Sequence, residues 1–403
     1  MSAATVSRWS RRYVLASAAF LVAWQVGVLS GASRATTVVL GLYGFVLHMV
    51  FGKAYALVPS YFDRSLPVPQ SPAVQFPLVL LGTLGLVADA AAVGPSWTGA
   101  IGAVLWSLGV GVFVGTLAWT IRTNPTGGNT GTGDANARLR PTDRLANAVV
   151  PVALAYLLLG ALVTLASRTM SSLPVAAGGS RVAHLLAAGG PEATHLIAAG
   201  TAALLIFGLG ARLLPRFLVK TPPRWLVATV LSAGALGPAL LAGTFRVEPW
   251  FRLGALVEAT AVVAYAGLAG LLYARSDRRR VGFYGVLAGA LAGVGGVALG
   301  LRFAFHGVSA ATVQAHLRLN LLGFVGSTIV GLAYQFYPPG VGAWPGSGDR
   351  TAALSIAGLA GGAVAQAVGL VSGIATLTTV GELAALLGAL SYAWVLASVF
   401  ATR

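Results

Sequence analysis

The sequence predicts an all-α integral membrane protein of about twelve transmembrane helices. Three observations predict this class: 57% of the 403 residues are hydrophobic, only 9% are charged, and long apolar runs recur with basic residues at their ends. A soluble domain carries about 25% charged residues, so a soluble fold of this composition could not cover its own surface. The main partner is therefore predicted to be a lipid bilayer.

The composition also excludes several functional classes. The chain has no Cys, which excludes disulfides, thiolate metal sites and cysteine nucleophiles. The formal net charge of +16 is typical of proteins that bind nucleic acid. The basic residues lie at the ends of the apolar runs, however, so no nucleic-acid partner is expected. The five histidines are the remaining nitrogen ligands.

Twelve runs reach the roughly twenty apolar residues that cross about 30 Å of hydrocarbon. They span residues 12–31, 36–59, 72–93, 98–121, 146–166, 191–214, 224–244, 251–274, 281–303, 313–337, 351–372 and 377–400. They are long and lack the two-residue alternation of strands. The 53 glycines would let helix backbones approach closely within lipid. Together the runs form a single membrane domain, residues 1–403.

The N-terminus and the basic residues predict the orientation. Ser10-Arg11-Arg12 before the first run weakly resembles a twin-arginine export signal, but the length of the run favours an uncleaved helix. With the N-terminus inside, seventeen Lys and Arg residues fall on the inner side, six on the outer side and three within helices. Such an excess marks the cytoplasmic side. We therefore expect a multi-pass protein of the cytoplasmic membrane with both termini in the cytoplasm.

Three predicted helices end alike at the inner side, with Gly, six residues and Pro. The pattern runs from Gly52 in the second helix, Gly208 in the sixth and Gly331 in the tenth. Each helix is second in a block of four, which predicts three pseudo-repeats. The alternative is chance, since Pro commonly follows helix ends. The predicted blocks are residues 12–121, 146–274 and 281–400, and a polar, Gly-rich inner loop at 122–145, predicted to be mobile, follows the first.

The same three helices carry the three histidines within the membrane, His48, His195 and His316. A membrane-buried ionisable residue is by default a functional-site hypothesis, and imidazole binds metals and haem iron. His195 and His316 lie about one turn from the outer end, so they are predicted to face one pocket. His48 lies roughly 20 Å into its helix at 1.5 Å per residue, and is not level with them. For each, the alternative is a packing histidine bonded to a neighbour.

Weaker ligand candidates lie close by. His184 and His306 are predicted in outer loops beside the sixth and tenth helices. Glu192 shares a helix face with His195 at a spacing of three residues. It either orients His195 as a carboxylate partner or stabilises the start of its helix.

Twelve helices in blocks of four, with histidines on each second helix, resemble subunit I of the haem-copper oxidases. The closest similarity is the tenth helix, which begins at His316 and ends at Tyr337-Pro338. The family's tenth helix begins His-x-His and ends in an aromatic-Pro pair. The resemblance implies that His316 is a high-spin haem ligand, and it puts Arg318 at the low-spin position. The architectural likeness spans the chain, whereas the sequence likeness is confined to helices two, six and ten.

The segment from Thr194 to Phe217 is also similar to membrane proteins of the nitric-oxide-response (NnrS) group, which bind haem and copper. The two resemblances imply haem as cofactor, with copper as a second candidate. They imply that His195, His48 and His316 are cofactor ligands, with His195 and His316 the main metal ligands. Arg318 is expected to meet a haem propionate, because Arg suits carboxylates. Implied partners are other respiratory subunits or a redox donor.

Departures from the oxidase pattern limit the chemistry. The family's copper needs one His on helix six and two adjacent His on helix seven. Here residues 224–244 contain none, Gly190 replaces the ligand on helix six, and Thr194 replaces a tyrosine. A complete binuclear oxidase centre is therefore not expected. One haem or metal site, in electron transfer or in the response to nitric oxide or dioxygen, is predicted instead.

Two other classes stay open from the sequence. A secondary transporter would use the membrane-buried charges Glu258, Asp89 and Lys53 together with the histidines. Glu258, about eight residues into its helix, is the costliest carboxylate, and is predicted either to relay protons or to pair with Arg318 or Arg302. The third class is a cofactor-free accessory subunit of a respiratory complex.

Overall fold

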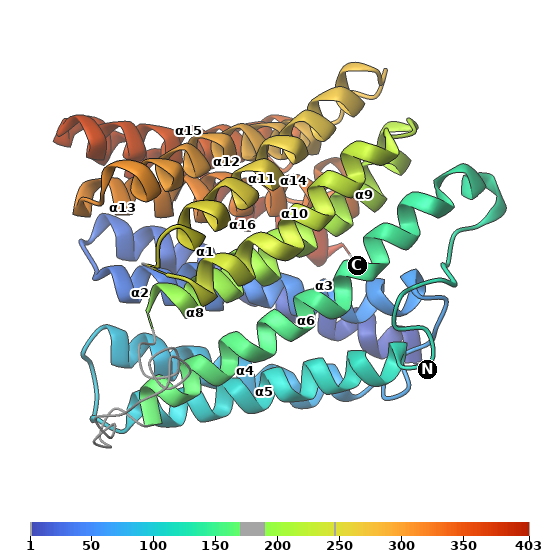
Figure 1. The fold of residues 1–403 in the computed structure, drawn as a ribbon, viewed down its shortest axis with the longest axis horizontal. Helices are drawn as coiled ribbons and strands as arrows, with labels where there is room; N and C mark the ends of the chain where they lie inside the picture. The colour runs from blue at the N-terminus through green and yellow to red at the C-terminus, as the bar shows by residue number, and fades with distance from the viewer. Residues whose placement is uncertain (1, 170–189, 246, 403) are drawn as a thin grey trace.

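The computed structural model describes residues 2–169, 190–245 and 247–402, and these residues form a bundle of long helices (Figure 1). Nine spans are single helices: α1 (Ser2–Leu29), α4 (Ser71–Ala90), α5 (Thr98–Ile121), α6 (Arg140–Thr169), α10 (Arg224–Gly243), α11 (Trp250–Ala274), α12 (Val281–His306), α15 (Asp349–Ser372) and α16 (Ala375–Ala401). Short 3₁₀ helices, η2 (Asp134–Leu139) and η5 (Pro339–Val341), lie in loops.

Three further spans each consist of an α-helix, a π-helix and a second α-helix. They are α2 (Arg34–Val38), η1 (Val39–Val46) and α3 (Leu47–Tyr61); α8 (Pro191–His195), η3 (Leu196–Ala203) and α9 (Leu204–Leu218); and α13 (Ala310–Leu317), η4 (Arg318–Gly326) and α14 (Ser327–Phe336). These are the second, sixth and tenth predicted helices. Figure 1 shows α2, α8 and α13 at one end of the bundle, called here the far end. Both chain termini lie at the other, the terminal end.

The prediction of about twelve transmembrane helices is confirmed, because twelve helices of the described chain are long and apolar enough to cross a membrane. Two helices begin six or more residues earlier than predicted. The first begins at Ser2 instead of residue 12, and the fifth at Arg140 instead of 146. Hydropathy marks the part of a helix that lies in hydrocarbon, whereas the helix itself continues through polar residues beyond it.

The three composite spans lie at the centre of the bundle. In each, 83% of the most apolar stretch is buried inside the protein, against 28–56% in the other nine. Their π-helical segments η1, η3 and η4 also pack against one another. Extended π-helical stretches are rare and often occur at functional sites. The centre of the molecule is therefore also its least regular part.

Small residues allow the outer helices to pack in pairs. A Cβ added to Gly85 of α4 would lie 2.8 Å from the Cα of Gly102 of α5. Likewise, a Cβ on Gly358 of α15 would lie 2.9 Å from the Cα of Gly388 of α16. Lipid offers no hydrophobic drive for helix association, so close backbone contact takes that role.

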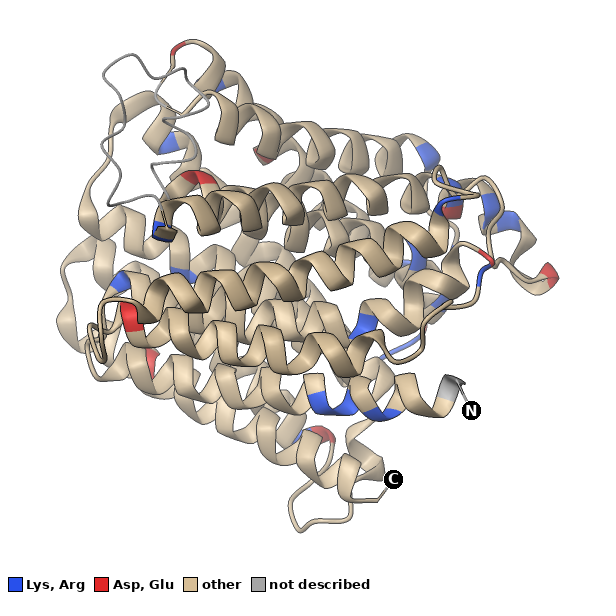
Figure 2. Cartoon of the chain, turned by 90° about the horizontal axis from the view of Figure 1, so that it is seen from below, with Lys and Arg blue, Asp and Glu red and all other residues tan. Residues whose placement is uncertain are grey.

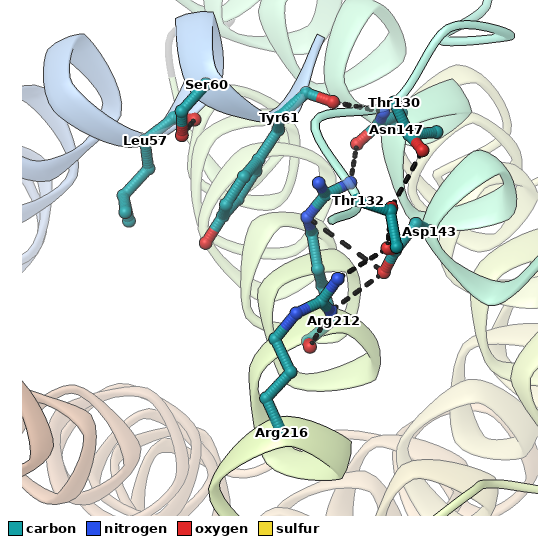
Figure 3. Close-up of polar contacts among 9 residues, drawn as sticks. All are labelled: Leu57, Ser60, Tyr61, Thr130, Thr132, Asp143, Asn147, Arg212 and Arg216. Carbon is teal, nitrogen blue, oxygen red and sulfur yellow. Dashed lines mark hydrogen bonds and ion pairs between the residues drawn. The ribbon is translucent and has the colours of Figure 1, made fainter. Parts of the chain in front are cut away.

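A buried polar cluster at the terminal end joins α6 to α9 (Figure 3). Asp143 of α6 is fully buried and accepts hydrogen bonds from both terminal nitrogens of Arg216, at 2.9 and 2.5 Å. The Arg212 guanidinium, 3% exposed, donates to Asn147 Oδ1 at 2.8 Å and lies 4.1 Å above the Tyr61 ring. This group, with Thr132, is called the polar cluster below.

The polar cluster also holds the segment predicted to be a mobile loop, 122–145. Thr132 donates a hydrogen bond to Asp143. Asn124 donates to the carbonyls of Phe62 and Asn129, at 3.1 and 2.7 Å. The segment thus makes specific contacts with α3 and α6, and its mobility stays a prediction.

Charged and aromatic residues distinguish the two ends from the lipid-facing middle. Figure 2 shows Lys and Arg gathered mostly at the terminal end. Exposed tryptophans lie at helix ends on both sides, Trp97 and Trp250 at the far end and Trp119 and Trp225 at the terminal end. Tryptophan is enriched at membrane–water interfaces, so these residues fit the two interfaces of a bilayer.

Candidate functional site

A cavity of about 1040 Å³ lies between the central spans and extends to the far end. Its walls come from all three composite spans and from α6, α10, α11 and α12. Most of the lining is apolar, with residues such as Val39, Leu241, Val297 and Phe324. Cofactor and ligand sites are typically apolar cavities of about 300–1,000 Å³ with a few convergent polar groups. This cavity is therefore the candidate site.

His195 enters the cavity from the last position of α8. Its Nδ1 lies 2.7 Å from the carbonyl oxygen of Pro191, one turn earlier. A carbonyl only accepts, so Nδ1 carries the proton and Nε2 keeps a lone pair. The ring also packs against Phe245, with ring centres 5.8 Å apart. The local fold thus fixes both the ring and its tautomer.

His316 enters the cavity from α13 in the same way. Its Nδ1 lies 2.9 Å from the carbonyl oxygen of Gly296 of α12 and 3.2 Å from Nδ2 of Asn320, and donation to the carbonyl would leave Nε2 its lone pair. Glycines on α12 make room for this, since a Cβ on Gly300 would lie 3.3 Å from His316 Cε1. Asn320, one turn later, also lines the cavity and donates to the His316 carbonyl at 2.9 Å.

The structure brings His195 and His316 to one cavity. Both side chains stay partly accessible because they face it. Within residues 2–169, 190–245 and 247–402, no hydrogen bond to either Nε2 is present. The same residues contain no group of three or more His, Cys, Asp or Glu side chains that could hold a metal ion. The site therefore offers two imidazoles, and not a complete protein cage for a metal.

His48 lies elsewhere, among aromatic rings between α1 and α3. Its ring centre is 5.0 Å from that of Phe20 and 6.1 Å from that of Tyr13. Its Nδ1 lies 3.0 Å from the Tyr43 carbonyl, and its buried Nε2 has no hydrogen-bond partner in the described chain. His48 does not line the cavity. It is not brought together with the other two histidines.

The weaker histidine candidates and Glu192 also stand apart. His306, at the end of α12, is exposed and does not line the cavity. His184 lies outside the described residues. Glu192 interacts electrostatically with His195, but the His195 Nδ1 bonds to Pro191 and not to this carboxylate. Glu192 is a neighbour of the site, and the backbone is what orients the imidazole.

Arg318 belongs to a separate small pocket, which it lines with Trp24 and Gln314. It forms no ion pair in the described chain, and its buried Nε has no hydrogen-bond partner there. The cation at the cavity mouth is instead Arg34, which is exposed, lines the cavity and has no partner among the described residues. Sequence reasoning did not single out Arg34, and its position just before an apolar run was the only signal available.

Glu258 lines the cavity from α11 and is 9% exposed. The ion pairs predicted for it with Arg318 or Arg302 are absent among the described residues. Its Oε2 has no hydrogen-bond partner there either. Gly237 of α10 accommodates it, since a Cβ at that position would lie 2.4 Å from Oε2. Oε2 of this lining residue therefore lies against α10 and has no hydrogen-bond partner in the described chain.

Comparison of the chain with protein-family models and with curated proteins finds no match. The geometry of the cavity is therefore the basis on which a function is inferred.

Proposed function

We propose that this chain is a membrane-embedded haem protein whose cofactor binds in the cavity through His316, His195 or both. One observation carries the proposal: two imidazoles share an apolar cavity, and each has its Nδ1 within hydrogen-bond distance of a backbone carbonyl and its Nε2 without a hydrogen-bond partner in the described chain. Histidines that bind metals almost always have their other nitrogen fixed in this way. The proposal extends to a role in electron transfer or in the response to nitric oxide or dioxygen.

The number of ligands favours haem over a metal ion bound by protein alone. A protein site for zinc or copper uses three or four side chains. Haem iron already has four ring nitrogens and needs one or two axial ligands from the protein. The cavity offers two imidazoles and no group of three ligands in the described chain. A copper site, and with it a binuclear oxidase centre, is correspondingly less well supported.

The lining also suits haem. Its apolar walls would surround the macrocycle and exclude water, while Arg34 stands at the mouth where acidic groups would be solvated. When bound, haem would supply an iron that exchanges one electron or binds a diatomic gas. The protein's part would be to hold the iron through an imidazole of fixed tautomer.

We further propose that the fold consists of three pseudo-repeats of four helices, as in haem-copper oxidase subunit I. Each repeat would place its second helix, with a π-helical segment, at the centre. The three glycines that begin the Gly-x6-Pro pattern pack alike. Gly52 faces Tyr13 of α1, Gly208 faces Val149 of α6, and Gly331 faces Gly282 of α12, which are the first helices of the three blocks. The excess of basic residues at the terminal end supports cytoplasmic termini in the inner membrane.

An absorption spectrum with metal analysis of the detergent-solubilised protein tests the haem proposal. The purified or haemin-titrated protein should show a Soret band. His316→Ala and His195→Ala should shift or remove this band, whereas the exposed His306→Ala should not. A protein that stays colourless after haemin titration would refute the proposal. An unchanged spectrum in the His195→Ala, His316→Ala double variant would also refute it.

A further inference from the structure

The carboxyl group of Glu258 is not used by the proposed haem site. It lies in the middle of a cavity-facing stripe on α11 formed by Phe251, Ala255, Glu258 and Val262. A carboxylate at membrane depth is costly unless it is paired. No Lys or Arg of the described chain forms an ion pair with it, and its Oε2 has no hydrogen-bond partner there.

The other charged residues that line the cavity supply no opposite charge for Glu258. Arg168 is paired with Asp89 at 2.5 Å, and Glu248 is paired with Arg252 at 2.9 Å. Arg34 is exposed at the mouth, where water and salt screen its charge. Glu258 is therefore the one buried lining charge in the described chain that the protein leaves without an opposite charge. Without an opposite charge the carboxyl group can stay neutral by keeping its proton, whereas a cation in the cavity would supply the charge that favours its ionised form.

Aromatic rings line the same space. Phe251 lies two turns from Glu258 on α11, and Phe324 of η4 also lines the cavity and, like Val262 of α11, lies against Gly293 of α12. Phe245 and Phe303 complete the aromatic lining and pack beside His195 and His316. The faces of aromatic rings attract cations, and such surroundings recognise organic ammonium groups.

We propose that the cavity binds a lipophilic organic cation, whose positive charge pairs with Glu258 while its apolar groups contact the surrounding rings. An inorganic cation does not fit, because Ca²⁺ and Mg²⁺ need six or more oxygen ligands and this site offers one carboxylate in an apolar wall. An organic cation is weakly hydrated and loses little when it leaves water for such a lining. The inference stands without the haem proposal, although a haem and a cation would compete for one cavity.

Binding of tetraphenylphosphonium to the detergent-purified full chain tests the inference. Triphenylphosphine oxide, a neutral probe of related shape, serves as the comparison, and both are measured by isothermal titration calorimetry or equilibrium dialysis. The cation should bind saturably and more tightly than the neutral probe. Equal affinities for the two probes, or no saturable binding of the cation, would overturn the inference using the wild-type protein alone.

Two variants test whether Glu258 supplies the negative charge that pairs with the cation. Glu258→Gln keeps the shape of the side chain and removes its charge, and should weaken cation binding at least about tenfold, as expected when one partner of a buried charge pair is lost. It should leave binding of the neutral probe unchanged. Glu382→Gln is the matched control, because Glu382 lies in a membrane span but does not line the cavity. Undiminished cation binding in a folded Glu258→Gln variant would place the cation elsewhere and reject the proposal.

The same variants separate this inference from the haem proposal. Glu258→Gln should leave any Soret band in place, and His316→Ala should still bind the cation. Added haemin should displace the cation from the wild-type protein if both proposals hold. If Glu258→Gln loses only cation binding and His316→Ala loses only the Soret band, the two sites are independent. Either proposal can then fail while the other survives.

Discussion

The polar cluster at the terminal end and the cavity at the far end differ in whether their buried polar groups have protein partners. In the polar cluster, Asp143 binds Arg216 and Thr132, and Arg212 binds Asn147, so the charges meet within the protein. In the cavity lining, the Nε2 atoms of two histidines and Oε2 of Glu258 have no hydrogen-bond partner in the described chain. Both regions include residues of α6 and of the α8–η3–α9 span. The contrast indicates that partnered polar groups build the fold, whereas unpartnered ones await a ligand.

Removing Asp143 should produce the largest loss of stability. Asp143→Ala leaves the buried Arg212 guanidinium without its carboxylate, and breaking a buried pair in this way costs about 3–5 kcal/mol. Thermal unfolding in detergent measures the loss. Asp134→Ala is the control, because that exposed carboxylate lies 3.9 Å from Arg140 and should be dispensable. An unchanged transition in Asp143→Ala would show that the polar cluster does not stabilise the fold.

Helix packing outside both regions provides a reference for the size of these stability losses. Gly102→Leu on α5 places atoms against α4, where even a Cβ would lie 2.7 Å from the Leu86 nitrogen. Overpacking of this kind costs about 1–3 kcal/mol. Gly111→Leu on the same helix meets nothing within 4 Å and should leave the unfolding temperature unchanged. Equal effects of the two variants would argue against the close α4–α5 contact.

A pair of histidine variants contrasts packing with ligand binding. His48→Ala empties a fully packed position and leaves α1 and α3 less well packed, for a loss of about 1–3 kcal/mol. His316→Ala enlarges a cavity that already exists, so it should cost less than about 1 kcal/mol while it impairs haem binding. Unfolding curves and haemin titrations of both variants check this. If His48→Ala impaired haem binding and His316→Ala caused the larger loss of stability, His48 would be the haem ligand. The contrast between packing and ligand binding would then be wrong.

The smallest effect is expected at the cavity mouth. Glu248 pairs with Arg252 at 2.9 Å, and both side chains are 49% exposed. Exposed ion pairs contribute about 0–1 kcal/mol, so Glu248→Gln should shift the unfolding transition only slightly, and less at high salt. A loss of stability comparable to that of Asp143→Ala would mean that the ion pair at the mouth is as well shielded from water as the polar cluster.

The helices could be predicted from the sequence because crossing a bilayer imposes a length and a composition that hydropathy records. His195 and His316 could be singled out because an imidazole in an apolar run is unusual. The polar cluster could not be predicted, since Asp143, Arg212 and Arg216 lie far apart in the sequence and only tertiary packing joins them. Arg34 was missed for the same reason. The π-helical segments leave no mark in residue type, because they depend on which carbonyl each N–H reaches.

Those π-helical segments affect the direction in which the histidine side chains point. His195 directly precedes η3, and His316 lies two residues before η4. A wide turn holds one residue more than an α turn, and each residue of an α-helix advances by about 100° around the axis. Deleting one residue from η3 would let this turn narrow to an α turn and would leave His195 at nearly the same angle relative to α9, whereas the same deletion within a regular α-helix would rotate the flanking parts by about 100°. The direction of the imidazole toward the cavity should therefore tolerate the loss of a residue from η3 but not from the regular helix next to it.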